Sequence, residues 1–424
     1  MIAVIIAAQR LGLLTGIVAG LALAFTAIVL FGGEMGSYKW LGTFFLHCLK
    51  MIIVPLIVFA MITGVAALGD VRKLGRLGGR TMLYYVVTTT VAVVIGALLV
   101  NIIQPGEGVP LTLHEQTADK VAAASDAGVG AIILSFVSDN ILASMAELQM
   151  LPIIVFSLLF GAVVTTLGEV GAPVIALCRG ANEAMMKIVH LVMLIAPVGV
   201  FGLIAGDLGE RLAEAGPDAL LTQLESLASY AATVVGGLAI HALVVIPVLL
   251  WLTTGRSPLT YARGMAGALL TAFSTASSAA TMPMTIEQVR DENGVDDRAA
   301  QFVIPLGATV NMDGTALYEA VAAIFIAQAY GIELGLGAQV LIIITATLAA
   351  VGAAGIPQAG LVTLVMVLQA VGLPTEGVGL ILAVDWLLDR FRTTVNVWGD
   401  AVGAAVMERH GLPDEGASAP LEPR

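Results

Sequence analysis

The sequence predicts an all-α integral membrane protein, and two observations carry this fold class. Of the 424 residues, 58% are apolar and only 12% are charged, about half the charged fraction of an ordinary soluble domain. Long apolar runs also approach or exceed the roughly 20 residues that a membrane-spanning helix needs. These runs are Leu11–Phe31, Leu41–Leu68, Met82–Ile103, Ile188–Ile204 and Tyr230–Leu252. A water-soluble fold of this length could not cover so much apolar surface, so we expect lipid to surround it.

The charged residues between the apolar runs indicate how the chain crosses the membrane. The loop Gly69–Arg80 carries four basic residues against one acidic residue, and Gly255–Arg263 carries two basic residues and no acid. By contrast, the segments Gly106–Asp126 and Gly206–Asp218 are rich in acidic residues. They account for part of the formal net charge of −12 of the whole chain. Because short basic loops stay in the cytoplasm, both termini are predicted to be cytoplasmic.

Two further features bear on the compartment. The first apolar run lacks a basic leader, so we expect a retained helix of a multi-pass protein in the cell membrane (plasma or inner) rather than a cleaved signal peptide. The two cysteines, Cys48 and Cys178, form no disulfide framework and no zinc spacing. No Asn-x-Ser/Thr sequon occurs, which favours a prokaryotic membrane.

Two segments in the second half of the chain interrupt the apolar pattern in a related way. Thr271–Pro283 and Ala349–Gly360 are rich in small residues and lie between apolar runs too short to span a bilayer. Charge placement suggests that the first hairpin enters from the cytoplasm and the second from outside. Paired broken segments of opposite entry are typical of a transporter site near the membrane midplane. Two kinked spanning helices are the alternative.

The last apolar segment, Val378–Val406, contains several charged residues. At about 100° per residue, five polar side chains fall on one narrow arc of a helix: Asp385, Asp389, Arg392, Asn396 and Asp400. Arg390 lies off this arc. Each charge at the centre of a spanning helix costs roughly 2.5–3.5 kcal/mol, so the arc is expected to line a site.

The residues on this arc suit a particular ligand. Arg392 has the planar fork that grips a carboxylate with two hydrogen bonds, and Asp389 can accept hydrogen bonds from an ammonium group. Together they describe a pocket for a molecule with an amine and a side-chain carboxylate. The alternative is an internal Asp–Arg pair that closes only on itself.

The stretch Pro305–Thr315 supplies a second group of polar atoms. Its residues Gly307, Asn311, Asp313 and Gly314 are poor in a helix interior, so the helix is expected to unwind and turn carbonyl groups inward. Hard oxygen ligands then gather from Asn311, Asp313, Asn396 and Asp400. This set favours a hard cation over zinc or copper. We expect sodium, because a transporter must release its ion on every cycle and calcium would be held too firmly.

Glu319 lies one turn beyond Thr315 on the same helix face. Burial disfavours a charged carboxylate, so Glu319 is expected to bind and release a proton. The alternative is a glutamate held by polar neighbours. His47, His190 and His241 stand alone on apolar segments and receive no role.

Three motifs resemble the glutamate/aspartate transporter family, the dicarboxylate/amino acid:cation symporters, in its animal excitatory amino acid transporter form. They are Asn311–Glu319 (NMDGTALYE), Ile356–Gly360 (IPQAG) and Asp385–Asn396 (DWLLDRFRTTVN). The resemblance covers nearly the whole chain. It implies eight transmembrane helices, two re-entrant helical hairpins, inverted repeats and a homotrimer.

The resemblance also implies a division into scaffold and mobile transport domains. Residues 1–78 would be scaffold helices 1 and 2, residues 79–104 transport helix 3, and residues 105–218 scaffold helices 4 and 5. Residues 219–424 would hold helix 6, hairpin 1 (about 258–290), helix 7, hairpin 2 (about 338–371) and helix 8. The transport domain would carry L-glutamate or L-aspartate with sodium by an elevator mechanism.

Residue roles follow from the same resemblance. Arg392 with Thr315 would hold the side-chain carboxylate and Asp389 the amino group, while Asn396 and the Ser277–Ser278 region would hold the α-carboxylate. The substrate set is Ser277, Ser278, Thr315, Gly360, Asp389, Arg392, Thr393 and Asn396. One sodium site would use Gly307, Asn311, Asn396 and Asp400. A second sodium site would use Tyr85, Thr88, Thr89, Asn311 and Asp313.

Two positions distinguish the animal pattern from the archaeal one. Archaeal members carry an arginine where this chain has Ala276 and lack one at Arg390, so Arg390 is expected to supply that charge, with Asp385 as a further supporting charge. Archaeal members have glutamine at Glu319. The acid here resembles members that co-transport a proton and return with potassium.

Other functions stay open at this point. A C4-dicarboxylate symporter would not need Asp389 to bind an ammonium group, and a neutral amino acid exchanger would have no use for Arg392. An anion-conducting channel could also use broken helices. No Ser–His, Cys–His or His–metal arrangement indicates an enzyme. We expect no bound cofactor and no nucleic-acid partner. The sequence does not decide between aspartate and glutamate as the preferred substrate, and it does not give the ion stoichiometry.

Overall fold

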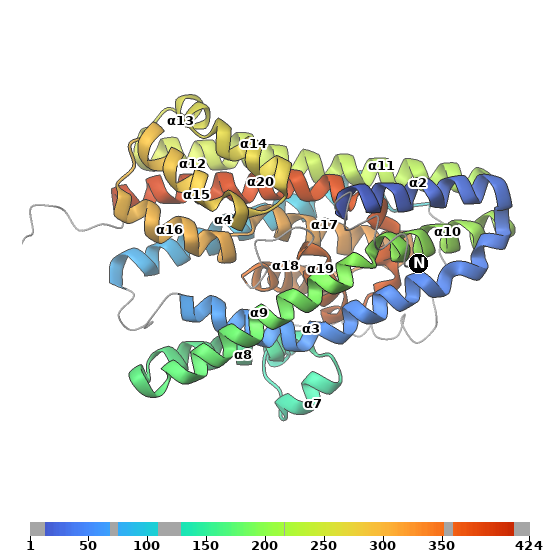
Figure 1. Ribbon diagram of the computed structural model, residues 1–424, viewed down its shortest axis with the longest axis horizontal. Coiled ribbons are helices and arrows are strands. Elements are labelled where there is room, and N and C mark those ends of the chain that lie inside the picture. The colour runs from blue at the N-terminus through green and yellow to red at the C-terminus, as the bar shows by residue number, and fades with distance from the viewer. Residues whose placement is uncertain (1–12, 68–74, 109–128, 216, 352–358, 411–424) are drawn as a thin grey trace, which may run out of the picture.

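A computed structural model describes residues 13–67, 75–108, 129–215, 217–351 and 359–410 of the chain (Figure 1). Every regular element in these ranges is a helix, which agrees with the predicted all-α class. The first half contains α2 (Leu13–Phe31), η1 (Gly32–Tyr38), α3 (Lys39–Ala67), α4 (Gly75–Ile103), α6 (Val129–Leu134), α7 (Ile141–Ala146), α8 (Met150–Thr165), η2 (Gly168–Val170), α9 (Ala172–Leu194) and α10 (Ala196–Ala215).

The second half is divided into more and shorter elements. They are α11 (Pro217–Ile240), η3 (His241–Val245), α12 (Ile246–Thr254), α13 (Pro258–Gly264), α14 (Ala266–Thr275), α15 (Ser278–Glu287), η4 (Gln288–Glu292), α16 (Asp297–Val310), α17 (Asp313–Ala329), α18 (Leu336–Ala350), α19 (Ala359–Ala370), η5 (Thr375–Gly377) and α20 (Val378–His410).

Four stretches of the described chain are long and apolar enough to cross a membrane, or up to five if one bent pair counts as a span. The first of them, Thr15–Ala66, contains both α2 and α3. The 33 residues of α20 are also long enough, but this helix carries the charged arc. The predicted multi-pass class is confirmed, and the number of crossings stays an expectation from the resemblance.

One predicted span is wrong as a single helix. The apolar run Ile188–Ile204 crosses from α9 into α10, and the two helices are bent by 51° where they meet. Pro197 is the second residue of α10. A proline lacks an amide donor and disfavours helical geometry at the residue before it, so the apolar run continues while the helix axis turns.

Both interrupted segments fold as helical pairs. α14 packs against α15, and α18 packs against α19, so the alternative of two kinked spanning helices is wrong. At the tip of the first hairpin, Ala276 has a positive φ of 50° and ends α14, while the Ser277 hydroxyl accepts from the Ala280 amide and begins α15. The tip of the second hairpin, including Gly355–Pro357, lies outside the described residues.

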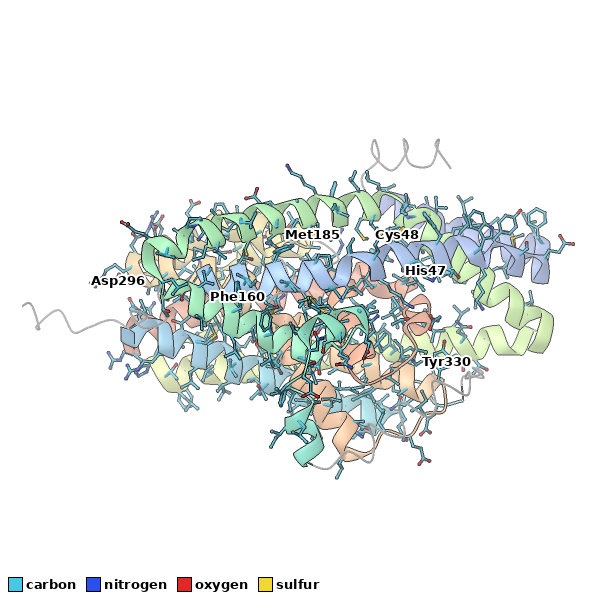
Figure 2. All side chains as sticks on the ribbon, turned by 90° about the horizontal axis from the view of Figure 1, so that it is seen from below. His47, Cys48, Phe160, Met185, Asp296 and Tyr330 are labelled. Atoms are coloured by element: carbon cyan, nitrogen blue, oxygen red, sulfur yellow. The ribbon has the colours of Figure 1, made fainter. Side chains whose placement is uncertain are left out.

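α17 occupies the centre of the second half. It packs against α4, α11, α19 and α20 (Figure 1), and within the candidate span Asp297–Ala329 every residue from 310 to 327 is buried. Figure 2 shows Asp296, just before α16, at one end of the molecule and Tyr330, just after α17, toward the other. The break between α16 and α17 therefore lies deep in the interior.

A separate layer is formed by α3, which packs against α8, α9 and α10. Glycines bring the backbones of α10 and α3 together. A Cβ on Gly202 would lie 2.6 Å from the amide nitrogen of Gly42, and one on Gly206 would lie 2.6 Å from the Cα of Lys39. We call the glycines Gly42, Gly202 and Gly206, together with Gly199, which packs against Phe45, the glycine seam. Such close packing of small residues is typical of helix pairs in membranes.

One ion pair joins this layer to the turn before α20. Lys50 Nζ on α3 lies 3.3 Å from Glu376 Oε1 on η5. Burial alone would raise the pKa of Glu376, but the Glu376 backbone amide and Lys50 outweigh it and lower that pKa.

Candidate functional site

The polar arc of α20 faces inward as predicted. Asp385, Asp389, Arg392, Asn396 and Asp400 are all buried, and the Arg392 side chain is 0% exposed. α20 packs against α14, α16 and α17. The polar arc of α20 is therefore surrounded by the helices of the first hairpin and of the broken segment Pro305–Thr315.

Arg392 lies between two carboxylates and one aromatic ring. Its Nη2 donates to Asp389 Oδ1 at 2.7 Å, and its Nη1 lies 3.1 Å from Asp385 Oδ1. The guanidinium carbon lies 3.8 Å from the centre of the Tyr318 ring, a distance that allows a cation–π contact. Nε makes no hydrogen bond to the residues described, and Nη1 meets Asp385 as an ion pair without good hydrogen-bond geometry, so the guanidinium can bind a further carboxylate.

Helices α17, α19 and α20 converge on Arg392. A Cβ on Gly360 would lie 3.0 Å from Arg392 Nη1 and 3.2 Å from Thr315 Cγ2. Asn396 Nδ2 lies 3.3 Å from Thr315 Oγ1, and Asn396 Oδ1 accepts from the Gly314 amide at 2.8 Å. The structure therefore brings together Thr315, Gly360, Arg392 and Asn396, with Thr393 also buried on α20.

Arg390 ties the first hairpin to α20. Its Nη1 donates to the carbonyl oxygens of Phe273 and Ser274, each at 2.8 Å. These carbonyls belong to the last turn of α14, where a cation is favourable. Ser277 and Ser278 are buried immediately beyond, and Arg390 thus supplies a positive charge at the hairpin tip.

A group of oxygen atoms lies around Asp400, where α16 ends. Asn311 Nδ2 donates to Asp400 Oδ1 at 2.9 Å, and Asn311 Oδ1 is buried with no hydrogen-bond partner among the described residues. A Cβ on Gly307 would overlap Asp400 Oδ1 and would lie 2.7 Å from the Tyr85 hydroxyl. This donor set fits a hard cation.

A second group surrounds Asp313, the first residue of α17. Its Oδ1 accepts from Thr89 at 2.6 Å and lies 3.4 Å from Thr88 Oγ1, both on α4. Its Oδ2 lies 3.0 Å from His241 Nε2. The predicted unwinding between Val310 and Asp313 is confirmed, because α16 ends and α17 begins there.

The comparison with known families agrees with this geometry. Residues 1–410 match the model of the sodium:dicarboxylate symporter family. The chain belongs to this family. Relatives of the symporter include excitatory amino acid transporter 3 of Oryctolagus cuniculus, which is 41% identical over 417 residues, covering 87% of this chain and 78% of the relative.

Two further relatives are similar over most of their lengths. Excitatory amino acid transporter 1 of Ambystoma tigrinum is 38% identical over 434 residues (89% of this chain, 79% of the relative). The putative sodium-dependent excitatory amino acid transporter glt-4 of Caenorhabditis elegans is 39% identical over 445 residues (94% and 88%). Because these relatives are animal proteins, the expectation of a prokaryotic membrane finds no support.

Two side chains of the symporter's site make contacts that the expectation did not specify. Asn396 was assigned to both the substrate and a sodium site, but its amide contacts Gly314 and Thr315. Tyr85 was placed beside Asp313, yet its hydroxyl donates to the Val303 carbonyl at 2.7 Å and faces Gly307. Both sodium-site assignments therefore stay predictions.

His241 is the residue that the sequence interpretation missed. Nothing in the sequence separates His241 from His47 and His190, yet its side chain is fully buried against Asp313. The nearest signal was Pro247, six residues later on the same helix.

Glu319 is fully buried on α17. Thr363 and Arg392 interact with its carboxyl group, although neither carboxyl oxygen makes a hydrogen bond of good geometry to the described residues. The contact with Thr363 leaves the alternative of a glutamate held by polar neighbours open. A buried carboxyl group of this kind is most readily tolerated when it carries a proton.

Proposed function

We propose that this chain is a sodium-coupled secondary active symporter that carries L-aspartate and L-glutamate. The observation that carries the proposal is Arg392, which is buried between Asp385 and Asp389 and whose Nε has no hydrogen-bond partner among the described residues. A buried guanidinium with free donors can bind a carboxylate. The similarity to excitatory amino acid transporters supports the same substrate class.

The substrate is proposed to replace part of the Arg392 ion-pair network. Its side-chain carboxylate binds Arg392 with Thr315, and its ammonium group binds Asp389. Asn396, Thr393 and the hairpin tip at Ser277–Ser278 hold the α-carboxylate. Gly360 leaves space beside Arg392 at the start of α19, where a larger residue would occupy the volume of the ligand.

Sodium ions are proposed as co-transported substrates on the two oxygen groups. Gly307, Asn311 and Asp400 would provide oxygen atoms for one ion, with Asn396 at its edge. Thr88, Thr89 and Asp313 would provide them for another, with Tyr85 and Asn311 between the two. Asn311 Oδ1, which lacks a hydrogen-bond partner among the described residues, is an acceptor available to a cation.

Movement is proposed to occur between two domains of a homotrimeric protein with cytoplasmic termini. The scaffold comprises residues 1–78 and 105–218, and the transport domain comprises residues 79–104 and 219–424. The glycine seam supports a rigid scaffold, and the buried stretch of residues 310–327 supports a compact transport domain that moves as a unit. Glu319 is proposed to carry a proton inward and to allow potassium on the return.

Uptake into proteoliposomes tests the function. Labelled L-aspartate, L-glutamate and succinate are offered with an inward sodium gradient, with potassium present or absent inside. Sodium-dependent accumulation of the amino acids above equilibrium is expected, with faster net uptake when potassium is inside. Accumulation of succinate alone would indicate a C4-dicarboxylate symporter, and conductance without accumulation would indicate an anion channel.

A further inference from the structure

A single π-helical turn interrupts the long helix that contains His241. α11 ends at Ile240, η3 is a π-helix over His241–Val245, and α12 begins at Ile246. The amide of Ile246 donates to the carbonyl of His241, five residues earlier. Pro247 follows and has no amide hydrogen. π-turns inside α-helices are rare and are frequently found at functional sites.

This turn leaves the Ala242 carbonyl without a donor from its own helix. Its α-helical donor would be the Ile246 amide, which bonds to His241 instead. Its π-helical donor would be residue 247, which is proline. A buried carbonyl without a partner is costly. The donor comes from another helix: the indole Nε1 of Trp398 on α20 donates to the Ala242 carbonyl at 3.1 Å.

Trp398 is itself held firmly in place. It is buried, and its ring lies against that of Tyr261, with ring centres 5.8 Å apart. The Tyr261 hydroxyl donates to the Ala401 carbonyl at 2.7 Å, also on α20. Trp398 therefore presents its N–H to the π-turn from a fixed position between Asn396 and Asp400.

The π-turn begins at the residue that contacts Asp313. His241 Nε2 lies 3.0 Å from Asp313 Oδ2, and both side chains are 0% exposed. Thr89 donates to the other oxygen of the same carboxylate at 2.6 Å. Asp313 is thus held from α4 on one side and from the π-turn on the other, and a change in the turn would move His241 relative to the carboxylate.

We propose that Trp398 is a positioning residue for the sodium site at Asp313. Its indole N–H stabilises the π-turn that sets the His241 ring against Asp313, so the geometry of the sodium ligand depends on a hydrogen bond made by the neighbouring helix. This inference rests on the proposed role of Asp313 as a sodium ligand, and it adds a residue that does not touch the ion.

Trp398→Phe removes the donor and keeps an aromatic ring. The sodium concentration for half-maximal aspartate uptake should rise by about three- to tenfold, the loss expected for one hydrogen bond, with the maximal rate nearly unchanged. The sodium concentration at the midpoint of the sodium-induced shift in melting temperature should rise equally in purified protein, which gives a readout independent of transport.

Trp398→His separates the hydrogen bond from ring packing. The imidazole Nε2 can occupy the ring position of the indole Nε1, although the histidine ring is smaller than that of phenylalanine. If the donor matters, the histidine variant retains sodium affinity closer to the parent than the phenylalanine variant does. If packing alone matters, the histidine variant is the weaker of the two, and the proposal is overturned.

Trp386→Phe is the matched control, because the Trp386 indole N–H also donates to a carbonyl at 3.1 Å, but to Ala383 in its own helix. Its sodium midpoint should stay at the parental value, and an equal shift in both phenylalanine variants would refute the proposal. Asp313→Asn tests the premise separately. Sodium dependence unchanged in that variant would remove the sodium assignment itself. If Asp313→Asn loses its sodium dependence while Trp398→Phe has no effect, only the role of Trp398 is refuted.

Discussion

The glycine seam and the oxygen groups at Asp313 and Asp400 are both places where glycine allows a close approach, yet their chemistry is opposite. At the seam, Gly202 meets the backbone of Gly42, with apolar neighbours. Near Asp400, Gly307 makes room for a carboxylate and a tyrosine hydroxyl. The same residue type therefore serves packing in one region and ligand oxygens in the other.

This difference separates stability from function. Close packing between α3 and α10 contributes van der Waals contacts that do not depend on a ligand. Buried carboxylates on α17 and α20 have a desolvation cost that only a partner offsets. Substitutions at the seam should lower stability without changing affinity, and substitutions near Asp313, Arg392 or Asp400 should change affinity first.

The largest expected effect is at Arg392. Arg392→Ala leaves the buried Asp385 and Asp389 without their cation, and removing one partner of such a pair costs about 2–5 kcal/mol. Uptake of acidic amino acids should fall at least about 30-fold, while serine or alanine is expected to enter the larger pocket that lacks the cation. Competition assays with labelled amino acids measure this change.

Arg290→Ala is the control for loss of a positive charge, because Arg290 pairs with Asp291 at an exposed position. Its uptake should match that of the parent. Glutamate affinity retained in Arg392→Ala would contradict the assignment of the carboxylate-binding residue.

The next effect compares two glycines directly. In Gly307→Ala the new methyl group overlaps the Asp400 carboxylate, so sodium affinity should fall by about tenfold or more, consistent with the 1–3 kcal/mol typical of overpacking. In Gly199→Ala it overlaps the Phe45 ring, so the melting temperature should fall while sodium affinity in the folded fraction stays constant. Sodium-dependent melting curves report both quantities. Equal losses of sodium affinity in both variants would contradict the assignment of packing to the glycine seam and of ion binding to the region near Asp400.

Glu319→Gln tests a second buried carboxyl group, on α17 of the proposed transport domain. The amide cannot ionise, so net uptake should lose its dependence on pH and internal potassium, while sodium-dependent exchange of aspartate continues. Uptake between about pH 6 and 8, around physiological pH, measures the effect, with the exposed Glu292→Gln as control. Unchanged pH and potassium dependence in Glu319→Gln would remove the proton role.

The smallest effect is expected where the two regions meet. Lys50 and Glu376 are partly exposed, and such pairs contribute about 0–1 kcal/mol. Lys50→Met and Glu376→Gln should each alter the uptake rate by less than about fivefold, with a similarly small coupling in the double variant. Because the pKa of Glu376 is lowered, the pair persists above the ordinary glutamate pKa of about 4.3 and is lost only as the pH falls below it. A change of more than about tenfold would mean that the ion pair controls the cycle.

The sequence was informative where a local rule was broken. Charges inside the apolar helix α20 predicted a lined face, and that face is buried. Poor helix formers at Asn311–Gly314 predicted the break between α16 and α17. Small residues at Thr271–Pro283 predicted the first hairpin. Each of these signals is an energetic cost that arises among residues close together in the sequence. Such a cost can be recognised from composition and spacing alone.

Other features depend on distant partners. His241 meets Asp313 across 72 positions of sequence, and the contact requires a π-turn whose odd carbonyl is satisfied from α20. The bend at Ile195 falls inside a continuous apolar run, so hydropathy could not locate it. The glycine seam likewise needs two helices in a fixed register. None of these contacts follows from helical periodicity.

The glycine seam has a mechanical consequence. Backbones in direct contact cannot slide, because a shift of one helical turn, about 5.4 Å, would push the side chains between the glycines into the facing main chain. The pair α3–α10 should therefore move as one rigid unit, because its two helices have no alternative register. A large displacement of another part of the molecule would then have to occur along the outer surface of this pair. There, the ion pair between Lys50 and Glu376 is weak and would resist the displacement little.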